Sequence, residues 1–142
     1  MKNMYLILTM LILFTGCKNE EVEQYENSIY GTWKLKEQWL GNVGETSVNW
    51  SEVANGYSIT FLENNNYSST EFTICQNNVN NGDFSLEENS SSKFVIISIQ
   101  CNSTGNELIR KYTYTFEGNN LILTPFSYPC DEGCSYKFKK LE

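Results

Sequence analysis

Cysteine is the residue type in this sequence with the most chemistry open to it. The chain has five cysteines and no histidine. Without histidine, Ser-His-Asp and Cys-His catalysis are excluded, and most zinc and haem sites lose their usual ligand. Cys75, Cys101, Cys130 and Cys134 lack the CxxC spacing of thiolate metal sites. No basic residue flanks the segment from Cys130 to Cys134 to lower a thiol pKa, so we expect neither a metal nor a redox centre.

Paired carboxylates are a second possible source of catalysis, because glycoside hydrolysis needs only two of them. Five glutamates lie near expected strand ends or turns, where we expect solvated surface: Glu63, Glu71, Glu87, Glu88 and Glu117. The chain has no G-x-S-x-G motif, no glycine-rich phosphate loop and no nucleophile beside a base. We therefore expect a protein that is not an enzyme, with no catalytic residue, cofactor or metal ion.

The N-terminal residues predict export. Lys2 supplies a positive charge, and the apolar run from Met4 to Phe14 is too short to cross a hydrocarbon core of about 30 Å as a helix. Such a run is typical of a secretory signal peptide. Its end, Leu13-Phe14-Thr15-Gly16-Cys17, resembles a bacterial lipoprotein signal. This resemblance implies that residues 1–16 are removed and that Cys17 is lipidated. The alternatives are an ordinary cleaved signal with a free thiol and a single transmembrane anchor.

Residues 17–28 follow as a polar segment. Lys18-Asn19-Glu20-Glu21 resembles the surface-export signal of Bacteroidetes lipoproteins. The high glutamate content predicts a flexible acidic tether that lifts the following domain off the membrane. We expect a lipid-anchored protein of the outer membrane, exposed on the cell surface or facing the periplasm.

The four remaining cysteines predict disulfides, because exported chains with an even number of cysteines usually oxidise them. Of the three possible pairings we favour Cys75–Cys101 and Cys130–Cys134. Gly133 can turn the chain sharply inside the smaller loop. The larger loop of about 27 residues would contribute roughly 3–4 kcal/mol in the chain-entropy model.

From Ile29 onward, short alternating runs are separated by asparagine and glycine, which is typical of strands and turns. Gly118-Asn119-Asn120 predicts a tight hairpin, and no segment after residue 29 shows a helical period. We therefore expect an all-β domain. Consecutive hairpins favour a single antiparallel up-and-down barrel, with a β-sandwich as the alternative. Eight strands are expected, at 30–40, 57–62, 67–75, 82–87, 93–100, 110–117, 121–124 and 135–141, with a long loop over 41–56.

Two motifs of this expected barrel resemble a known family. The first strand opens with Gly31-Thr32-Trp33, and residues 112–124 read YTYTFEGNNLILT. Following a lipoprotein tether, this order is similar to the lipocalin-like domain of small Bacteroidetes lipoproteins. The resemblance implies a barrel domain over residues 29–142 with Trp33 packed across its closed end. The domain is shorter than transport lipocalins, and an eight-stranded barrel of this kind can fill itself with side chains.

Aromatic residues are the best candidates for function, because the chain has 9 Tyr, 8 Phe and 3 Trp. Tyr112 and Tyr114 share a strand face that is either core or ligand-binding. Trp39 and Trp50 lie at or within the loop 41–56, near the expected barrel mouth, where they bind a ligand or fold back as a plug. We expect a binding protein for a small apolar molecule or an envelope component.

The charge of the chain limits its partners. Ten basic and 17 acidic residues give a net charge of −7. No basic stripe can then neutralise a phosphate backbone, so we expect no nucleic-acid partner. The same charge would steer a basic enzyme, which makes an inhibitor of a basic hydrolase, or an accessory subunit, the alternative function. We expect a monomer whose partners are the membrane, through its N-terminal lipid anchor, and a small hydrophobic ligand or an envelope protein.

Overall fold

The computed structural model describes residues 28–41, 49–71, 80–101, 106–126 and 133–141. The expected signal peptide, Cys17 and the tether up to residue 27 lie outside these residues, as do Cys75 and Cys130. The described chain consists of strands and turns without a helix, which confirms the all-β prediction. It accordingly includes no helix of the length and apolarity needed to span a membrane.

Nine strands are present in the described part of the chain. In sequence order they are β1 (Gly31–Leu40), β2 (Ser51–Glu52), β3 (Ser58–Phe61), β4 (Asn66–Ser69), β5 (Asn80–Glu88), β6 (Lys93–Cys101), β7 (Asn106–Glu117), β8 (Asn120–Pro125) and β9 (Cys134–Lys140).

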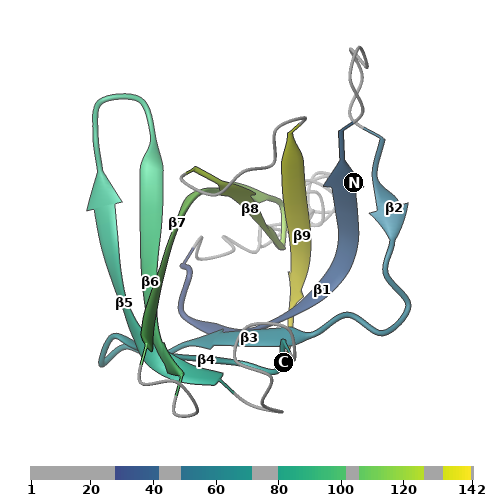
Figure 1. The fold of residues 1–142 in the computed structure, drawn as a ribbon. Coiled ribbons are helices and arrows are strands. Elements are labelled where there is room, and N and C mark those ends of the chain that lie inside the picture. Colours follow the sequence, from purple (N-terminus) through teal and green to yellow (C-terminus); the bar gives the residue numbers. More distant parts are fainter. Residues whose placement is uncertain (1–27, 42–48, 72–79, 102–105, 127–132, 142) are drawn as a thin grey trace, which may run out of the picture.

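Eight of these strands close into one antiparallel barrel. β1 and β3 to β9 pair in sequence order, and β9 pairs again with β1. Figure 1 shows them arranged round a ring, with β3 and β4 along the bottom, β5 to β7 on the left and β9 and β1 on the right. The prediction of a single up-and-down eight-stranded barrel is confirmed, and the sandwich alternative is wrong.

The additional strand, β2, lies inside the segment that was expected to be a loop. It pairs with β1 at Glu37↔Glu52 and Gln38↔Ser51, while β3 pairs with the first residues of β1. β9 runs along the opposite edge of β1, so β2 and β3 share one edge. The two residues of β2 are both polar and exposed, and they carry no alternating pattern that a sequence could reveal.

Inward-facing residues of the barrel strands form one buried cluster. Trp33 is 2% exposed, its indole Nε1 donates a hydrogen bond to the Ile29 carbonyl (2.7 Å), and its ring lies 6.1 Å from that of Phe116. Trp33 is therefore a structural core residue, as expected. The buried cluster around it includes Leu35, Ile59, Phe61, Tyr67, Phe84, Val95, Ile97, Ile99, Leu121, Leu123 and Phe138.

The backbone requires glycine at several positions, of which Gly118 and Gly82 bear on the strands beside the groove. Gly118 has a φ of 56° in the two-residue turn between β7 and β8, where Glu117 pairs with Asn120. This is the hairpin predicted from Gly118-Asn119-Asn120. Gly82 lies in β5 with no room for a side chain, because a Cβ there would stand 1.9 Å from the Ser98 carbonyl oxygen of β6.

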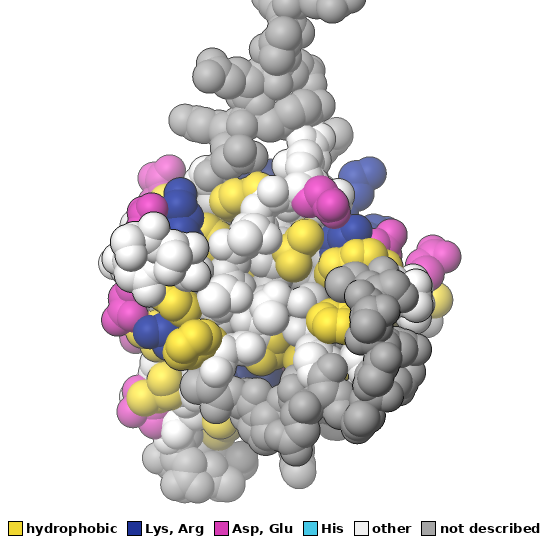
Figure 2. Space-filling view, turned by 90° about the horizontal axis from the view of Figure 1, so that it is seen from above, with side chains coloured by type: hydrophobic (Ala, Val, Ile, Leu, Met, Phe, Trp, Pro, Cys, Tyr) yellow, Lys and Arg dark blue, Asp and Glu magenta, His cyan; other side chains and the backbone are white. Residues whose placement is uncertain are grey.

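Charged side chains of both signs share the surface. On the face seen in Figure 2, lysine or arginine and aspartate or glutamate side chains intermingle around the outline, with apolar and neutral polar side chains between them. This face therefore presents small mixed patches rather than one extended field of a single sign.

Candidate binding groove between the β5–β6 hairpin and β7

β7 changes its partner strand halfway along its length. Its first part pairs with β6, and that ladder ends at Phe94↔Thr113. Its second part pairs with β8, from Tyr112↔Pro125 to Glu117↔Asn120. The β5–β6 ladder meanwhile continues to Glu88↔Lys93. The tip of the β5–β6 hairpin and the end of β7 therefore diverge, and Figure 1 shows β7 bending away from the upright hairpin.

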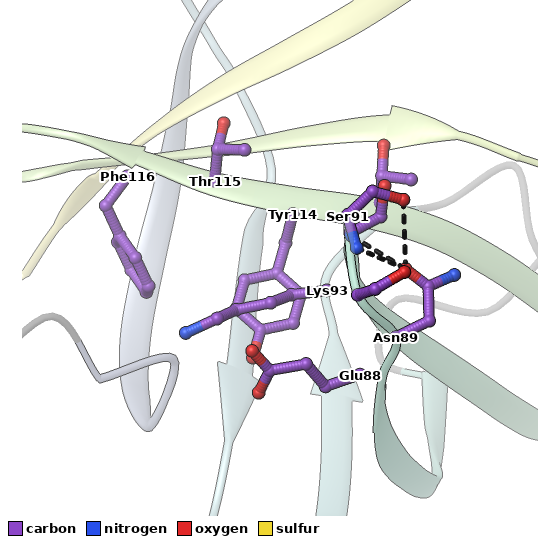
Figure 3. Close-up of a pocket in the computed structure, with 10 residues that line it drawn as sticks. Glu88, Asn89, Ser91, Lys93, Tyr114, Thr115 and Phe116 are labelled. Carbon is purple, nitrogen blue, oxygen red and sulfur yellow. Dashed lines mark hydrogen bonds between the residues drawn. The ribbon is translucent and has the colours of Figure 1, made fainter.

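A groove of about 610 Å³ lies in this divergence. One wall is the hairpin tip and the other is the end of β7 (Figure 3). The lining residues are Glu88, Asn89, Ser90, Ser91, Ser92, Lys93, Thr113, Tyr114, Thr115 and Phe116.

The hairpin wall of the groove is held by its own hydrogen bonds. The side-chain Oδ1 of Asn89 accepts hydrogen bonds from the backbone N–H groups of Ser91 (3.0 Å) and Ser92 (2.8 Å) and from the Ser91 hydroxyl (3.3 Å). The Asn89 N–H donates in turn to the Ser92 carbonyl (3.0 Å). An asparagine that bonds the backbone two and three residues ahead closes a tight turn, so this wall has a defined shape.

Two aromatic rings form the floor of the groove. Tyr114 and Phe116 meet edge to face, with ring centroids 6.0 Å apart and an interplanar angle of 80°. Phe116 also packs on Trp33, which ties the floor to the barrel core. Figure 3 shows both rings on one side of β7 and Thr115 on the other.

The groove carries one charge of each sign at its rim. Lys93 and Glu88 are cross-strand neighbours at the end of the β5–β6 ladder, and both are exposed. Figure 3 shows their side chains reaching from the hairpin toward the two rings. Burial, with the nearby charge of Glu88, raises the pKa of Tyr114. The Tyr114 hydroxyl therefore stays protonated at neutral pH, able to donate and accept a hydrogen bond.

Tyr112, the second tyrosine expected to bind a ligand, lies deeper than Tyr114. It faces the interior and packs against the core cluster. Burial raises the pKa of Tyr112, and a hydrogen bond with Arg110 opposes that rise. Burial also raises the pKa values of Tyr57 and Tyr67, so the interior holds several neutral hydroxyls beside its apolar core. Four of the five predicted surface glutamates are exposed, whereas Glu71 is half-buried. The charge of Glu71 adds to the rise in the pKa of Tyr57.

Trp39 and Trp50 do not line the groove. A bulge between Leu35 and Glu37 changes the alternation of β1, so Trp39 pairs with Ser135 and shares the outward side of Glu37. Trp50 lies over the Nζ of Lys137, 4.3 Å from the ring centroid. Lys137 also bridges Glu37 and Glu117, each at 3.1 Å. The four predicted binding residues are thus divided between the outer surface and the inward face of β7.

Cys101 and Cys134 are the two predicted disulfide residues within the described chain. Cys101 ends β6 and Cys134 begins β9, and both are buried. Each of the two side chains has an interaction partner. Their expected partners, Cys75 and Cys130, lie outside the described residues, so the pairing stays a prediction.

Metal-ligating side chains and comparisons with known proteins give further evidence on the site. The described residues contain no group of three or more histidine, cysteine, aspartate or glutamate side chains that could hold a metal ion. In comparisons with known proteins, no family model, no curated protein and no solved structure matched the chain. The groove is therefore interpreted from its own residues.

Proposed function

We propose that this chain is a lipid-anchored binding protein of the bacterial envelope, with a lipocalin-like barrel whose ligand binds in the groove between the β5–β6 hairpin and β7. The observation that carries the proposal is the divergence of β7 from β6, which leaves Tyr114 and Phe116 as an aromatic floor beneath a polar rim. Binding sites commonly combine an apolar floor with a few polar groups that fix orientation.

The buried cluster inside the barrel supports a site on the rim. The largest inward-facing side chains form one buried cluster in which Phe61, Val95 and Leu121 are completely buried. A ligand entering that cluster would have to displace close-packed side chains, which is costly. A ligand in the groove needs no such rearrangement, so an envelope component bound at the rim fits the structure better than an apolar molecule inside the barrel.

Site-specific photo-crosslinking tests the groove in living cells. A photoreactive residue at the exposed Thr115 should capture the ligand, and the same residue at Ser85, exposed on β5 and outside the groove lining, serves as the matched control. The crosslink should disappear when Tyr114→Ala is added. Equal crosslinking from both positions, or none from Thr115, would contradict a ligand site in the groove.

The membrane anchor is the second part of the proposal and rests on the sequence of residues 13–17. Several acyl chains on Cys17 would hold the protein durably to a bilayer, at about 0.8 kcal/mol per buried methylene. Cys17→Ala should abolish labelling by a radioactive fatty acid and move the protein from the membrane to the soluble fraction. Retention in the membrane without label would instead favour a transmembrane anchor.

The disulfide pairing Cys75–Cys101 and Cys130–Cys134 belongs to the same proposal, since an exported protein meets an oxidising environment. Mass spectrometry of unreduced peptides from the native protein tests it directly. A peptide joining Cys101 to Cys134 would replace the proposed pairing.

A further inference from the structure

The backbone of β7 turns some of its peptide groups toward the groove. Glu117 and Asn120 flank a two-residue turn, which makes them a mutually hydrogen-bonded pair. The Phe126 N–H donates to the Lys111 carbonyl (2.8 Å), so the peptide groups of Lys111 also face β8. Odd-numbered residues of β7 therefore direct their N–H and C=O groups at β8. The even-numbered residues, among them Phe116, direct theirs to the opposite edge.

No strand in the described chain covers that opposite edge beyond Thr113. The β6 ladder stops at Phe94↔Thr113, and Lys93 does not pair with Tyr114. The N–H and C=O of Phe116 consequently face the groove beyond the last residue of β6 that lies opposite β7. The hairpin tip does not replace the missing strand, because the N–H groups of Asn89, Ser91 and Ser92 are already bonded within the turn.

The sequence of this edge suits strand pairing. Residues 113–116 read Thr-Tyr-Thr-Phe, and β-branched and aromatic residues are those most favoured in strands. Proteins usually protect an open edge with proline, a bulge or a lysine within the strand, and this stretch has none of these. An edge of this kind is a template for another extended chain.

We propose that the ligand of the groove is an extended peptide segment of a partner protein, which adds as a short strand to the edge of β7 at residues 114–116. This inference rests on the proposed function and names its ligand class. Only a polypeptide repeats N–H donors and C=O acceptors at the two-residue period that the edge of β7 presents. A saccharide offers hydroxyls, but not at this period.

The side chains of the groove indicate the composition of that peptide. One face of an added strand would contact Tyr114 and Phe116, which calls for valine, isoleucine or an aromatic residue at alternate positions. The other face would lie beside Thr113 and Thr115, which suit small polar residues. No ion pair of Lys93 is found among the described residues, so a carboxylate on the peptide is expected to meet its ammonium group.

Binding of capped synthetic hexapeptides to the full chain in detergent micelles tests the proposal. The probe is a pool in which threonine alternates with valine, isoleucine or phenylalanine and one terminal position is glutamate. N-methylation of alternate residues removes either the donors that face β7 or those that face away. One of the two methylated series should bind at least about tenfold more weakly, while the other keeps its affinity.

Two variants at one position provide the matched control on the protein. Phe116→Ala and Phe116→Pro both remove the ring, and neither removes a hydrogen bond to β8. Only proline also removes the N–H that faces the groove. Proline should weaken peptide binding about tenfold relative to alanine, with equal thermal midpoints. The methylated peptides, measured with the unaltered chain, decide the question should either variant fail to fold.

Each of the following outcomes would overturn the proposed addition of a peptide strand to β7. Equal binding of both methylated series means that side chains alone are recognised. Binding of chitotetraose but not of any peptide in the pool makes the ligand a glycan. If Thr115 crosslinks to a ligand in cells while the whole pool fails to bind, the groove remains a binding site and only strand addition is wrong. If the crosslink fails as well, the proposed function falls with it.

Discussion

The barrel interior and the groove are built from the same strands, yet one is closed and the other open. Between Val95 and Ile99, β6 is paired on both sides, and its inward side chains are buried. Beyond Thr113, β7 keeps β8 but loses β6, and its inward rings, Tyr114 and Phe116, are half-exposed. The alternation of residues is unchanged along β7. The difference shows that the end of a hydrogen-bonded ladder, rather than a change in side-chain pattern, creates the candidate site.

The largest loss of stability is expected for a substitution in the barrel interior. Phe61 is completely buried, with its ring 4.9 Å from that of Phe84 and 5.4 Å from that of Tyr67. Phe61→Ala should lower the free energy of unfolding by about 3–5 kcal/mol, because it leaves a cavity in a packed core. Urea denaturation measures this change. The neighbouring Leu62 is 49% exposed, and Leu62→Ala should stay within about 0.5 kcal/mol.

A smaller loss is expected where two strands of the closed ladder approach each other. A Cβ on Gly82 would stand 1.9 Å from the Ser98 oxygen, so Gly82→Ala must push β5 and β6 apart and should cost about 1–3 kcal/mol. At Gly118 a Cβ would meet nothing within 4 Å. Gly118→Ala should therefore cost only about 1 kcal/mol, from the left-handed backbone. Equal thermal midpoints for the two variants would contradict the close approach.

The buried tyrosines predict a loss of stability in alkali. Burial raises the pKa of Tyr67 in the folded state, although a hydrogen bond with Ser69 opposes the rise. A raised acid pKa means that the folded state keeps its proton while the unfolded state, with a tyrosine pKa of about 10, loses it. Stability is thus unaffected below pH 10 and falls above it, by up to about 1.4 kcal/mol per pH unit for each such group. Tyr67→Phe should remove one group's share of the slope, measured by urea midpoints between pH 9 and pH 11.5. An unchanged slope would place that hydroxyl in water.

Most of the barrel could be predicted from the sequence because its strands are amphipathic or uniformly apolar. The run Lys93–Gln100 and the hairpin around Gly118 were placed within a residue of β6 and of the β7–β8 turn. Trp33 was correctly assigned to the core. β2 and the first residues of β7 were missed, because Ser51-Glu52 and Asn106-Glu107 are residue types that strands disfavour. Their pairing comes from neighbouring strands and not from their own propensity.

The candidate site was only partly predictable. Tyr114 was predicted as a candidate because an aromatic stripe on a strand is either core or site, and it lines the groove. Trp39 was placed near the barrel mouth, whereas the bulge after Leu35 gives it an outward register. A bulge adds one residue without a sequence pattern of its own, so alternation alone assigns the following residues to the wrong face. The groove itself depends on where β6 stops pairing with β7, which is a property of two strands together.

The groove side of the comparison predicts a variant that separates binding from stability. Tyr114 is half-exposed and Tyr114→Ala removes few buried contacts, so the unfolding free energy should fall by only about 1 kcal/mol. Ligand captured at Thr115 should nevertheless be lost, because half of the aromatic floor is gone. Ile109→Ala, at a residue 61% exposed on the same strand but outside the groove, should change neither quantity. A fall in stability as large as that of Phe61→Ala would make Tyr114 part of the core.

The smallest effect on stability is expected at the hairpin tip, where a change should still alter the groove. Asn89→Ala removes three hydrogen bonds that close the turn, all of them exposed, so the global loss should be about 0.5–1 kcal/mol. The amides of Ser91 and Ser92 lose their acceptor, and hydrogen exchange at these two positions should accelerate while exchange in the core of β6 stays unchanged. Asn89→Asp keeps an acceptor oxygen and should restore slow exchange. Because the turn forms a wall of the groove, Asn89→Ala should also weaken ligand binding more than it weakens folding. If exchange at Ser91 and Ser92 is already fast in the unaltered protein, the wall is not preformed and the ligand itself must order it.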